Sequence, residues 1–429
     1  MTRRNLLVRA VTGIGGPGLM AACKNQEDEV TTNGRGRSSF RIAEVHIHPV
    51  EMRRIYRTRM ARTDPVGKEA SLYLLIEFVT GDGTRGVGEL SDIEPGWNAP
   101  AISEFERFLF EQLVGADASD RHRLSEQVAE AIPQHWHVEL RRMLWAAVDM
   151  ALLDLVGKVR QIPAYELLGG RYRTHIPVSW VAYVRHSSVD TEGIEEKVAQ
   201  GFRAFKLKVG SDLAADSENV AAIRRIAGPE AYLKVDPSGT WDEEEAIENI
   251  RKLAEAGVDA VETPVKAASR DIAKNRPQIV NRNPDEAALS LARVRRAVPT
   301  KIIEHVGDFA DAFAIALVRH QAVDIFNIIP SQTGSLSRAK RLAEIAEAAG
   351  LQALLGSTVE LGPGTAAALH LGVSSKALTV ASDLIGPGHL EDDVVTPVFS
   401  YESGRLRVPA GSGIGVALDE AKLREHRPA

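Results

Sequence analysis

Five side chains in the middle of the chain have the types and the spacing of a metal-assisted proton-transfer site. Lys206 and Lys208 lie two residues apart in AFKLKV, so on a strand both would share one face, opposite the apolar residues that alternate with them. Asp236, Glu262 and Glu304 each close a short apolar run, in YLKVD, VDAVE and KIIE. Carboxylate oxygens are ligands of hard cations, with Mg²⁺ as the first choice. A lysine beside such an ion can abstract a proton.

The chemistry predicted from this set is removal of the proton α to a carboxylate. A metal would hold the substrate carboxylate and stabilise the enolate that forms. Two neighbouring ammonium groups beside a dication are expected to lower each other's pKa, which would prepare one of them as a base. The simpler alternative is structural, because acids at strand ends often cap the following helix and barrel lysines can be neutralised by interior acids. Three acids behind a lysine pair favour the site.

Strand and helix patterns indicate two domains that would position these residues. Residues 40–160 begin with strand-like runs around Gly81-Asp82-Gly83, a hairpin signal, and continue as helices, which predicts a separate α+β domain. From 161 to 385, short apolar runs alternate with helical stretches, which predicts a (β/α) barrel. The polar stretch at 266–286 is interpreted as an insertion after the fourth strand. His305 alternates with Glu304, so we expect it to face the helix layer or a loop rather than the metal.

Composition excludes several classes of function. The chain has 429 residues, with 52 Lys+Arg against 58 Asp+Glu, and the two signs are interspersed. Nucleic acid is therefore not an expected partner, and the 5% aromatic content also argues against a base-stacking surface. No apolar stretch is long and clean enough to predict a transmembrane span. The expected partner is a small carboxylate substrate, and a homo-oligomer is expected.

The N-terminus predicts export. Residues 1–23 contain Thr2-Arg3-Arg4-Asn5-Leu6-Leu7, which resembles a twin-arginine signal, and they end at Cys23, the single cysteine, in a lipoprotein-like context. Residues 24–39 are polar and read as a linker. We expect periplasmic or membrane-anchored protein, with cytoplasmic protein as the alternative. Fractionation of the source cell tests this: full-length, unprocessed protein in the cytoplasm would refute export, and Cys23→Ser should release a lipid-anchored form from membranes.

Several motifs resemble those of the enolase superfamily, in its muconate-lactonizing enzyme and mandelate racemase branch. DMALLDLVGK at 149–158 and IPAYELLGGR at 162–171 are similar to its signature. The K-x-K at 206–208, the Asp-x-Ser-Gly-x-Trp run at 236–241 and Glu262-Thr263-Pro264 are similar to its second, third and fourth barrel strands. GSTVELGPGTAAALHLG at 356–372 resembles its seventh-strand region. The resemblance covers about 40 to 420.

This resemblance implies an α/β fold, a modified TIM (β/α) barrel with an α+β capping domain that residues 386–429 complete. It also implies Mg²⁺ on Asp236, Glu262 and Glu304, with Lys208 as the base and Lys206 as the neighbour that tunes it.

Departures from the family pattern shape the predicted reaction. The third ligand lies in IIEHVGD rather than in Asp-Glu-Ser, and Ile329 stands where the lactonizing branch carries a sixth-strand lysine. Ser357 occupies the neighbourhood of the racemase branch's seventh-strand histidine. With one base in view, a lyase (a hydroxy-acid or sugar-acid dehydratase) or a cycloisomerase is favoured, and a racemase or epimerase is the runner-up. The alternatives from other classes are a barrel glycosidase, which would use Glu262 and Glu304 as its carboxylate pair, and a non-catalytic carboxylate-binding barrel.

Overall fold

The computed structural model describes residues 40–55, 68–182, 184–185, 188–266, 283–307 and 311–428. The predicted export signal, the linker and most of the predicted insertion lie outside the described residues. Within the described part of the chain, no helix is long and apolar enough to cross a membrane.

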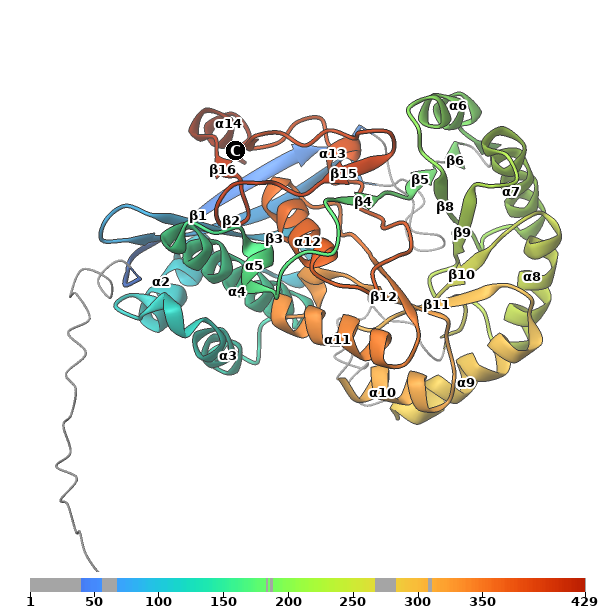
Figure 1. Ribbon diagram of the computed structural model, residues 1–429, viewed down its shortest axis with the longest axis horizontal. Helices are drawn as coiled ribbons and strands as arrows, with labels where there is room; N and C mark the ends of the chain where they lie inside the picture. Colours follow the sequence, from blue (N-terminus) through green and yellow to red (C-terminus); the bar gives the residue numbers. More distant parts are fainter. Residues whose placement is uncertain are drawn as a thin grey trace, which may run out of the picture.

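The first domain is an antiparallel sheet covered by helices (Figure 1). Strands β1 (Ile42–Arg53), β2 (Ala70–Thr80) and β3 (Arg85–Ile93) pair in sequence order, and β2 turns into β3 through the predicted hairpin. Helices α2 (Ile102–Leu113), α3 (Arg121–Ala131) and α4 (Val138–Arg160) pack on the sheet through one apolar cluster. Gly88 permits the closest contact, since a Cβ there would lie 1.9 Å from the carbonyl oxygen of Ala147 on α4.

The second domain is a curled parallel sheet with helices on its outer side (Figure 1), as the alternating pattern predicted. Its strands, in spatial order, are β13 (Gln352–Leu355), β12 (Ile325–Ile328), β11 (Lys301–His305), β10 (Ala260–Glu262), β9 (Tyr232–Asp236), β8 (Ala204–Lys208) and β5 (Trp180–Ala182). Bridges from Ala353 to Leu378 and from Val178 to Ser382 close the barrel. The predicted fold class, a modified TIM barrel with an α+β capping domain, is confirmed.

Helices alternate with these strands and the smaller elements join the two domains. The barrel helices are α6 (Thr191–Ala199), α7 (Leu213–Ala227), α8 (Glu243–Glu255), α9 (Pro284–Ala297), α10 (Asp311–Arg319), α11 (Leu336–Ala348) and α12 (Gly362–Val373). The remaining helices and turns are η1 (Pro95–Trp97), η2 (Ala118–Asp120), α5 (Ala164–Leu167), η6 (Pro330–Gln332), α13 (Gly386–His389) and α14 (Glu420–Glu425). The short strands are β4 (His175–Pro177), β6 (Val184–Arg185), β7 (Ser188–Val189), β14 (Val395–Thr396), β15 (Arg405–Arg407) and β16 (Ala417–Leu418).

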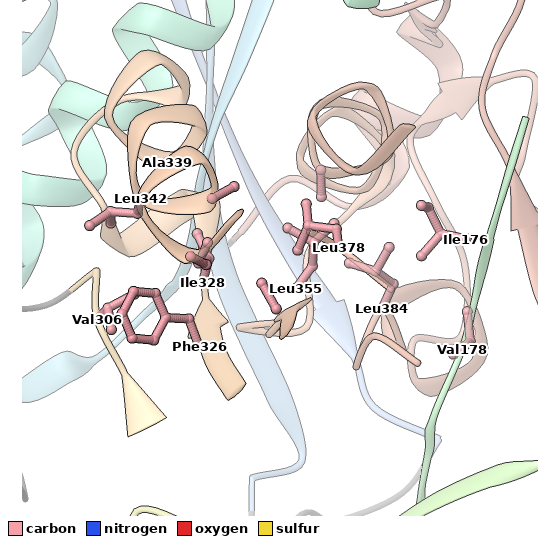
Figure 2. Packing of buried hydrophobic residues seen from close by; sticks show 14 of the residues in the cluster. Ile176, Val178, Val306, Phe326, Ile328, Ala339, Leu342, Leu355, Leu378 and Leu384 are labelled. Carbon is pink, nitrogen blue, oxygen red and sulfur yellow. The ribbon is translucent and has the colours of Figure 1, made fainter. Parts of the chain in front are cut away.

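The barrel strands separate two sets of apolar side chains, and this separation fixes which residues face the interior. The larger set fills the space between sheet and helices; Figure 2 shows part of it, with Phe326 and Val306 beneath α11. The smaller set lies inside the barrel and consists of Ala260, Ile303, Ile325 and Leu354. Because side chains alternate along a strand, these two sets show which residues of each strand face the barrel interior and which face the helices.

The signature helix α4 holds the two domains together through buried carboxylates. Asp154 accepts hydrogen bonds from the backbone N–H groups of Val87 on β3 and Ile414 in the C-terminal segment, at 2.9 and 2.8 Å. Asp149 pairs with Arg121 at 3.0 Å and accepts from the N–H of Leu336, at the start of barrel helix α11. These signature acids are therefore structural and lie outside the chemistry.

Glu89 on β3 makes a comparable link, and it carries a pH dependence. Its carboxyl group accepts from the N–H groups of Leu361 and Gly364 at the start of α12 and from the Ser91 hydroxyl. Burial, together with the charge of Glu360, raises the pKa of Glu89 from 4.5 to about 8. The folded protein thus keeps a proton that the unfolded chain releases, so this group's contribution to stability is present at low pH and is lost as pH rises from about 4.5 to about 8.

We expect Glu89→Gln to flatten the decline of Tm across this pH window relative to the wild type. The amide stays neutral, so the folded and unfolded states no longer differ in protonation at this position. It cannot accept every hydrogen bond of the carboxyl group, so its curve should also lie lower at acidic pH. Thermal melts between pH 5 and 8 measure the slope, with the exposed Glu255→Gln as control. Parallel curves for Glu89→Gln and the wild type would refute the assignment.

Candidate active site

Four consecutive barrel strands end in polar residues at the carboxyl end of the barrel. Lys208, Asp236, Glu262 and His305 are the last residues of β8, β9, β10 and β11. Lys208 lies in register with Asp236, and Glu262 follows Ala260, an interior residue, by two positions. All these side chains therefore start from the interior face at one level, which is where barrel enzymes carry out chemistry.

Lys206 lies one level deeper and joins the carboxylates into a network. Its Nζ lies 2.8 Å from Glu262 Oε1, 3.1 Å from Asp236 Oδ2 and 3.1 Å from Asp383 Oδ2. Burial would lower the pKa of Lys206, but Asp383, Glu262 and Asp236 outweigh it and hold that pKa well above its usual range. This direction is opposite to the one expected from a neighbouring ammonium group, because three carboxylates surround the amine.

Lys208 lies nearer to solvent, with 27% of its side chain exposed, and its Nζ is 2.5 Å from Asp236 Oδ2. Asp236 also accepts from the N–H of Ser238 at 2.8 Å. Burial opposes ionisation of Asp236, but Lys208 and Lys206 lower its pKa below the usual range. Burial has the same effect on Glu262, where Lys206 and then His305 hold the pKa well below its usual range. Both carboxylates are therefore charged.

Sequence analysis missed two members of the network, Lys234 and Asp383. Lys234 Nζ lies 2.6 Å from Asp383 Oδ1, and Lys234 is fully buried one level below Asp236 on β9. Both could have been found. Lys234 shares the face of Asp236 in YLKVD, and Asp383 closes the apolar run ALTVASD as the three predicted ligands close theirs.

On β11 the prediction for His305 is wrong. His305 lies in register with Asn327, and Ile303, two residues earlier, belongs to the interior set. His305 Nε2 lies 2.8 Å from Glu262 Oε1 and 3.4 Å from Asn327 Nδ2. The expectation that His305 faces the helix layer or a loop is wrong. Ile303 packs inward, and His305, two residues later on the same strand, therefore starts from the same face.

Glu304 takes the opposite face. It is in register with Phe326, which belongs to the set beneath the helices (Figure 2). Its Oε1 accepts from Thr263 Oγ1 and from the N–H of His305, both at 2.9 Å. Burial is the main reason that its pKa lies well above the usual range. The structure brings Asp236 and Glu262 together through Lys206, and the charges of Glu262 and Asp236 also act on Glu304, where they add to the effect of burial and raise its pKa.

The far wall of the mouth, where the sixth strand ends, carries no ionisable side chain over residues 328–335, which read IIPSQTGS. Ile329 in this stretch is 6% exposed. A Cβ on Gly356 of the neighbouring strand would lie 2.6 Å from Ile329 Cγ1 and 2.4 Å from Asn327 Oδ1, so Ile329 and Asn327 both pack against the same glycine. Beyond it, Glu360 is buried and accepts from the Ser331 and Thr358 hydroxyl groups.

The chemistry of the donor set fits a divalent cation. Among the described residues, Glu262 Oε2, Glu304 Oε2 and Asn327 Oδ1 are buried oxygens without a hydrogen-bond partner. A buried oxygen of a charged carboxylate needs compensation, and a cation between strand ends would supply it. The donor atoms of Asp236, Glu262 and Glu304 are not gathered within 4.8 Å of one another.

A second acidic group gathers elsewhere, on the C-terminal segment. In the described parts of the chain, Asp392, Glu425 and His426 form the one set of three such residues whose donor atoms all lie within 4.8 Å. Lys422 forms ion pairs with both Asp392 and Glu425, so an ammonium group already supplies the positive charge there. This cluster lies on α14 and its neighbours, beside the cap sheet and away from the barrel mouth (Figure 1).

Comparison with known proteins finds a family model for each of the two domains. The family model "Mandelate racemase / muconate lactonizing enzyme, N-terminal domain" matches residues 42–169, and "Enolase C-terminal domain-like" matches residues 191–422.

Similar proteins share most of their length with this chain. Muconate cycloisomerase 1-1 of Acinetobacter lwoffii is 31% identical over 360 residues, which is 82% of this chain and 88% of the relative. A chloromuconate cycloisomerase of Cupriavidus pinatubonensis is 28% identical and covers 84% of this chain and 92% of its own. Among solved structures, muconate lactonizing enzyme from Pseudomonas fluorescens in complex with muconolactone has a TM-score of 0.77 at 25% identity, covering 91% of this chain and 100% of that one.

Proposed function

Because this chain belongs to the mandelate racemase and muconate lactonizing enzyme branch of the enolase superfamily, we propose that it is a metal-dependent cycloisomerase acting on an unsaturated dicarboxylate. The observation that carries the proposal is the pairing of one partly exposed lysine, Lys208, with a far wall whose residues 328–335 offer no second lysine. A cycloisomerisation transfers a single proton to carbon, so one acid is sufficient. Of the two outcomes that the sequence favoured, the relatives named above support the cycloisomerase and offer no support for the dehydratase.

Lys208 is the proposed proton donor. In the proposed reaction, a carboxylate oxygen of the substrate adds to one end of a conjugated C=C bond, and the electron pair moves toward the second carboxylate. The α carbon then takes a proton from Lys208 Nζ, which regains one from solvent, so atoms and charge balance over the cycle. Asp236, 2.5 Å away, holds the ammonium group in place. In reverse, Lys208 removes the α proton, as the sequence predicted.

The charges around the mouth favour a dianionic substrate. Three ammonium groups and three carboxylates contact one another here, so their charges balance: Lys206, Lys208 and Lys234 against Asp236, Glu262 and Asp383. A divalent cation added to this balanced set leaves two positive charges uncompensated, which a dicarboxylate would neutralise. Muconate, named by the relatives, is such a molecule.

The proposed metal is Mg²⁺, with Asp236 and Glu262 as ligands at adjacent strand ends. When bound, the ion would withdraw charge from the substrate carboxylate and so make the α carbon reactive. Lys206, lying between the two carboxylates, orients both of them from below and keeps them ionised.

A second candidate function is epimerisation, and His305 is the observation that favours it. Lys208 on β8 and His305 on β11 lie on strands separated by two others, so they could reach a substrate from different sides. An epimerase needs such a pair, because the proton leaves one face and returns to the other.

Incubation of the purified chain with cis,cis-muconate and with chloromuconates tests the proposal. Loss of diene absorbance and appearance of a lactone in the NMR spectrum, in the presence of Mg²⁺ or Mn²⁺, is the expected result. Lys208→Ala serves as the control for non-enzymatic closure. Epimerisation of saturated α-substituted acids with no lactone from any dienedioate would contradict the cycloisomerase and support the second candidate.

A further inference from the structure

A pocket opens at the amino end of the barrel, opposite to the candidate active site. Three strands contribute their first residues to this amino-end pocket: Tyr232 of β9, Lys301 of β11 and Gln352 of β13. Its volume of about 460 Å³ lies within the range of small-molecule sites, roughly 300–1,000 Å³. Because barrel enzymes carry out chemistry at the carboxyl end, catalysis does not account for this pocket.

The apolar set inside the barrel forms the floor of the amino-end pocket and separates it from the mouth. Tyr232 and Val380, which both line the pocket, pack against this interior set. Lys301 and Gln352 each stand two residues before one of its members on the same strand, so their side chains also start from the interior face. A molecule in the pocket would therefore meet an apolar floor with polar side chains around it.

The charge of the pocket lining is entirely positive. Arg203, Lys301 and Arg405 line it, and the described lining contains no Asp or Glu. Within the part of the chain that the structure describes, none of the three forms an ion pair: Arg203 donates to two backbone carbonyl oxygens, and Lys301 donates to Gln352 Oε1 at 2.8 Å. The whole chain has a net charge of -6, so three uncompensated cations at one pocket are a local feature that favours an anionic ligand.

Two carboxylates act on the tyrosine of the pocket, and each has an arginine of its own. Asp259 pairs with Arg224 at 2.6 Å, and Asp324 pairs with Arg295 at 2.7 Å, so neither acid compensates the cations of the lining. Burial, followed by the charges of Asp259 and Asp324, raises the pKa of Tyr232, so its hydroxyl group stays protonated. This hydroxyl oxygen is buried and has no hydrogen-bond partner among the described residues, so it keeps a donor for a ligand oxygen.

We propose that the amino-end pocket binds a small organic anion, an apolar body that carries one carboxylate or phosphate group. The charged group would lie among Arg203, Lys301 and Arg405, and the apolar body would contact Tyr232 and Val380. An inorganic anion would leave the apolar floor uncovered, and an uncharged molecule would leave the cations uncompensated. This site is separate from the proposed function, since it uses none of the residues of the barrel mouth.

Calorimetric titration of the full chain with benzoate and with phenyl phosphate tests the proposal. EDTA is present throughout, so that no metal in the barrel mouth captures the probes. We expect binding that weakens as salt is added, because the three cations are exposed. Inorganic phosphate and benzyl alcohol, which each carry half of the required chemistry, should bind at least about 10-fold more weakly. Binding of one probe only would support the site and identify the charged group that it prefers.

Variants locate the bound probe. The double variant Lys301→Met/Arg405→Met should weaken binding by about 10-fold, and both side chains are exposed, so the fold should stay intact. The matched control is Arg107→Met, an exposed arginine of α2 without an ion pair in the described structure, and it should bind as the wild type does. Lys208→Ala, in the barrel mouth, should also keep the affinity. Loss of binding in Lys208→Ala but not in the double variant, or no binding of either probe to the wild type, would overturn the proposal and leave the proposed function standing.

Discussion

Lys208→Ala is expected to lower turnover by at least about 10²-fold, because it removes the group that exchanges a proton with the α carbon. The side chain is partly exposed, so the loss should leave folding intact. Steady-state kinetics on the substrate found by the lactone assay measure the change, with the melting temperature as the check on folding. The exposed Lys252→Ala, on α8, is the matched control and should retain full turnover.

Retention of α-deuterium exchange by Lys208→Ala would contradict this role and would direct attention to His305.

Lys206→Ala is expected to act differently from Lys208→Ala. A role in tuning Lys208 would predict only a shifted pH profile, but Lys206 pairs with Asp236, Glu262 and Asp383 in the interior. Its removal would leave buried carboxylates without a compensating charge. We therefore expect the main effect to be a loss of stability rather than a shift in the pH profile of turnover.

Glu262→Gln should abolish both metal binding and turnover. Glu262 is fully buried between Lys206 and His305, at 2.8 Å from each, so its charge is central to the site. Removing one partner of a buried pair also costs about 3–5 kcal/mol of stability. Calorimetric titration with Mg²⁺ and Mn²⁺, together with chelator treatment of the wild type, separates loss of metal from loss of fold.

The matched control for this variant is Asp383→Asn. Asp383 also pairs with Lys206, and with Lys234, but it follows the closing segment of the barrel and is not one of the proposed metal ligands. We expect it to lose stability to a similar extent and to keep metal affinity. Equal loss of metal affinity in both variants would show that the charge network as a whole, rather than Glu262, determines binding.

The sequence predicted correctly those parts of the site where apolar and polar residues alternate regularly along a strand. In AFKLKV, apolar residues alternate strictly with lysines, so the pattern alone places both lysines on the interior face. The hairpin at Gly81-Asp82-Gly83 and the alternation of strands and helices were equally direct, and they led to the correct fold class.

On the fifth strand, His305 was placed wrongly because the local pattern is ambiguous. In KIIEHV two isoleucines adjoin, so either could face inward, and the acid was assigned to the mouth by analogy with Asp236 and Glu262. Only pairing with β10 and β12 decides the phase, with Ile303 beside Glu262 on one side and Ile325 on the other. Asp383 was missed for a different reason: ALTVAS was interpreted as a strand, but the acid that follows it was not considered, and in the structure this segment pairs only through isolated bridges.

The most direct test of the account is the stereochemistry of proton transfer in D₂O. If Lys208 is the single acid, lactone formed in D₂O should carry one deuterium, at the α carbon and on one face, and lactone recovered from the reverse reaction in D₂O should have exchanged only the hydrogen on that same face. NMR of the product and of the recovered lactone reads both. Deuterium on both faces of the α carbon would contradict one-sided catalysis and would identify a second base at the mouth, for which His305 is the candidate.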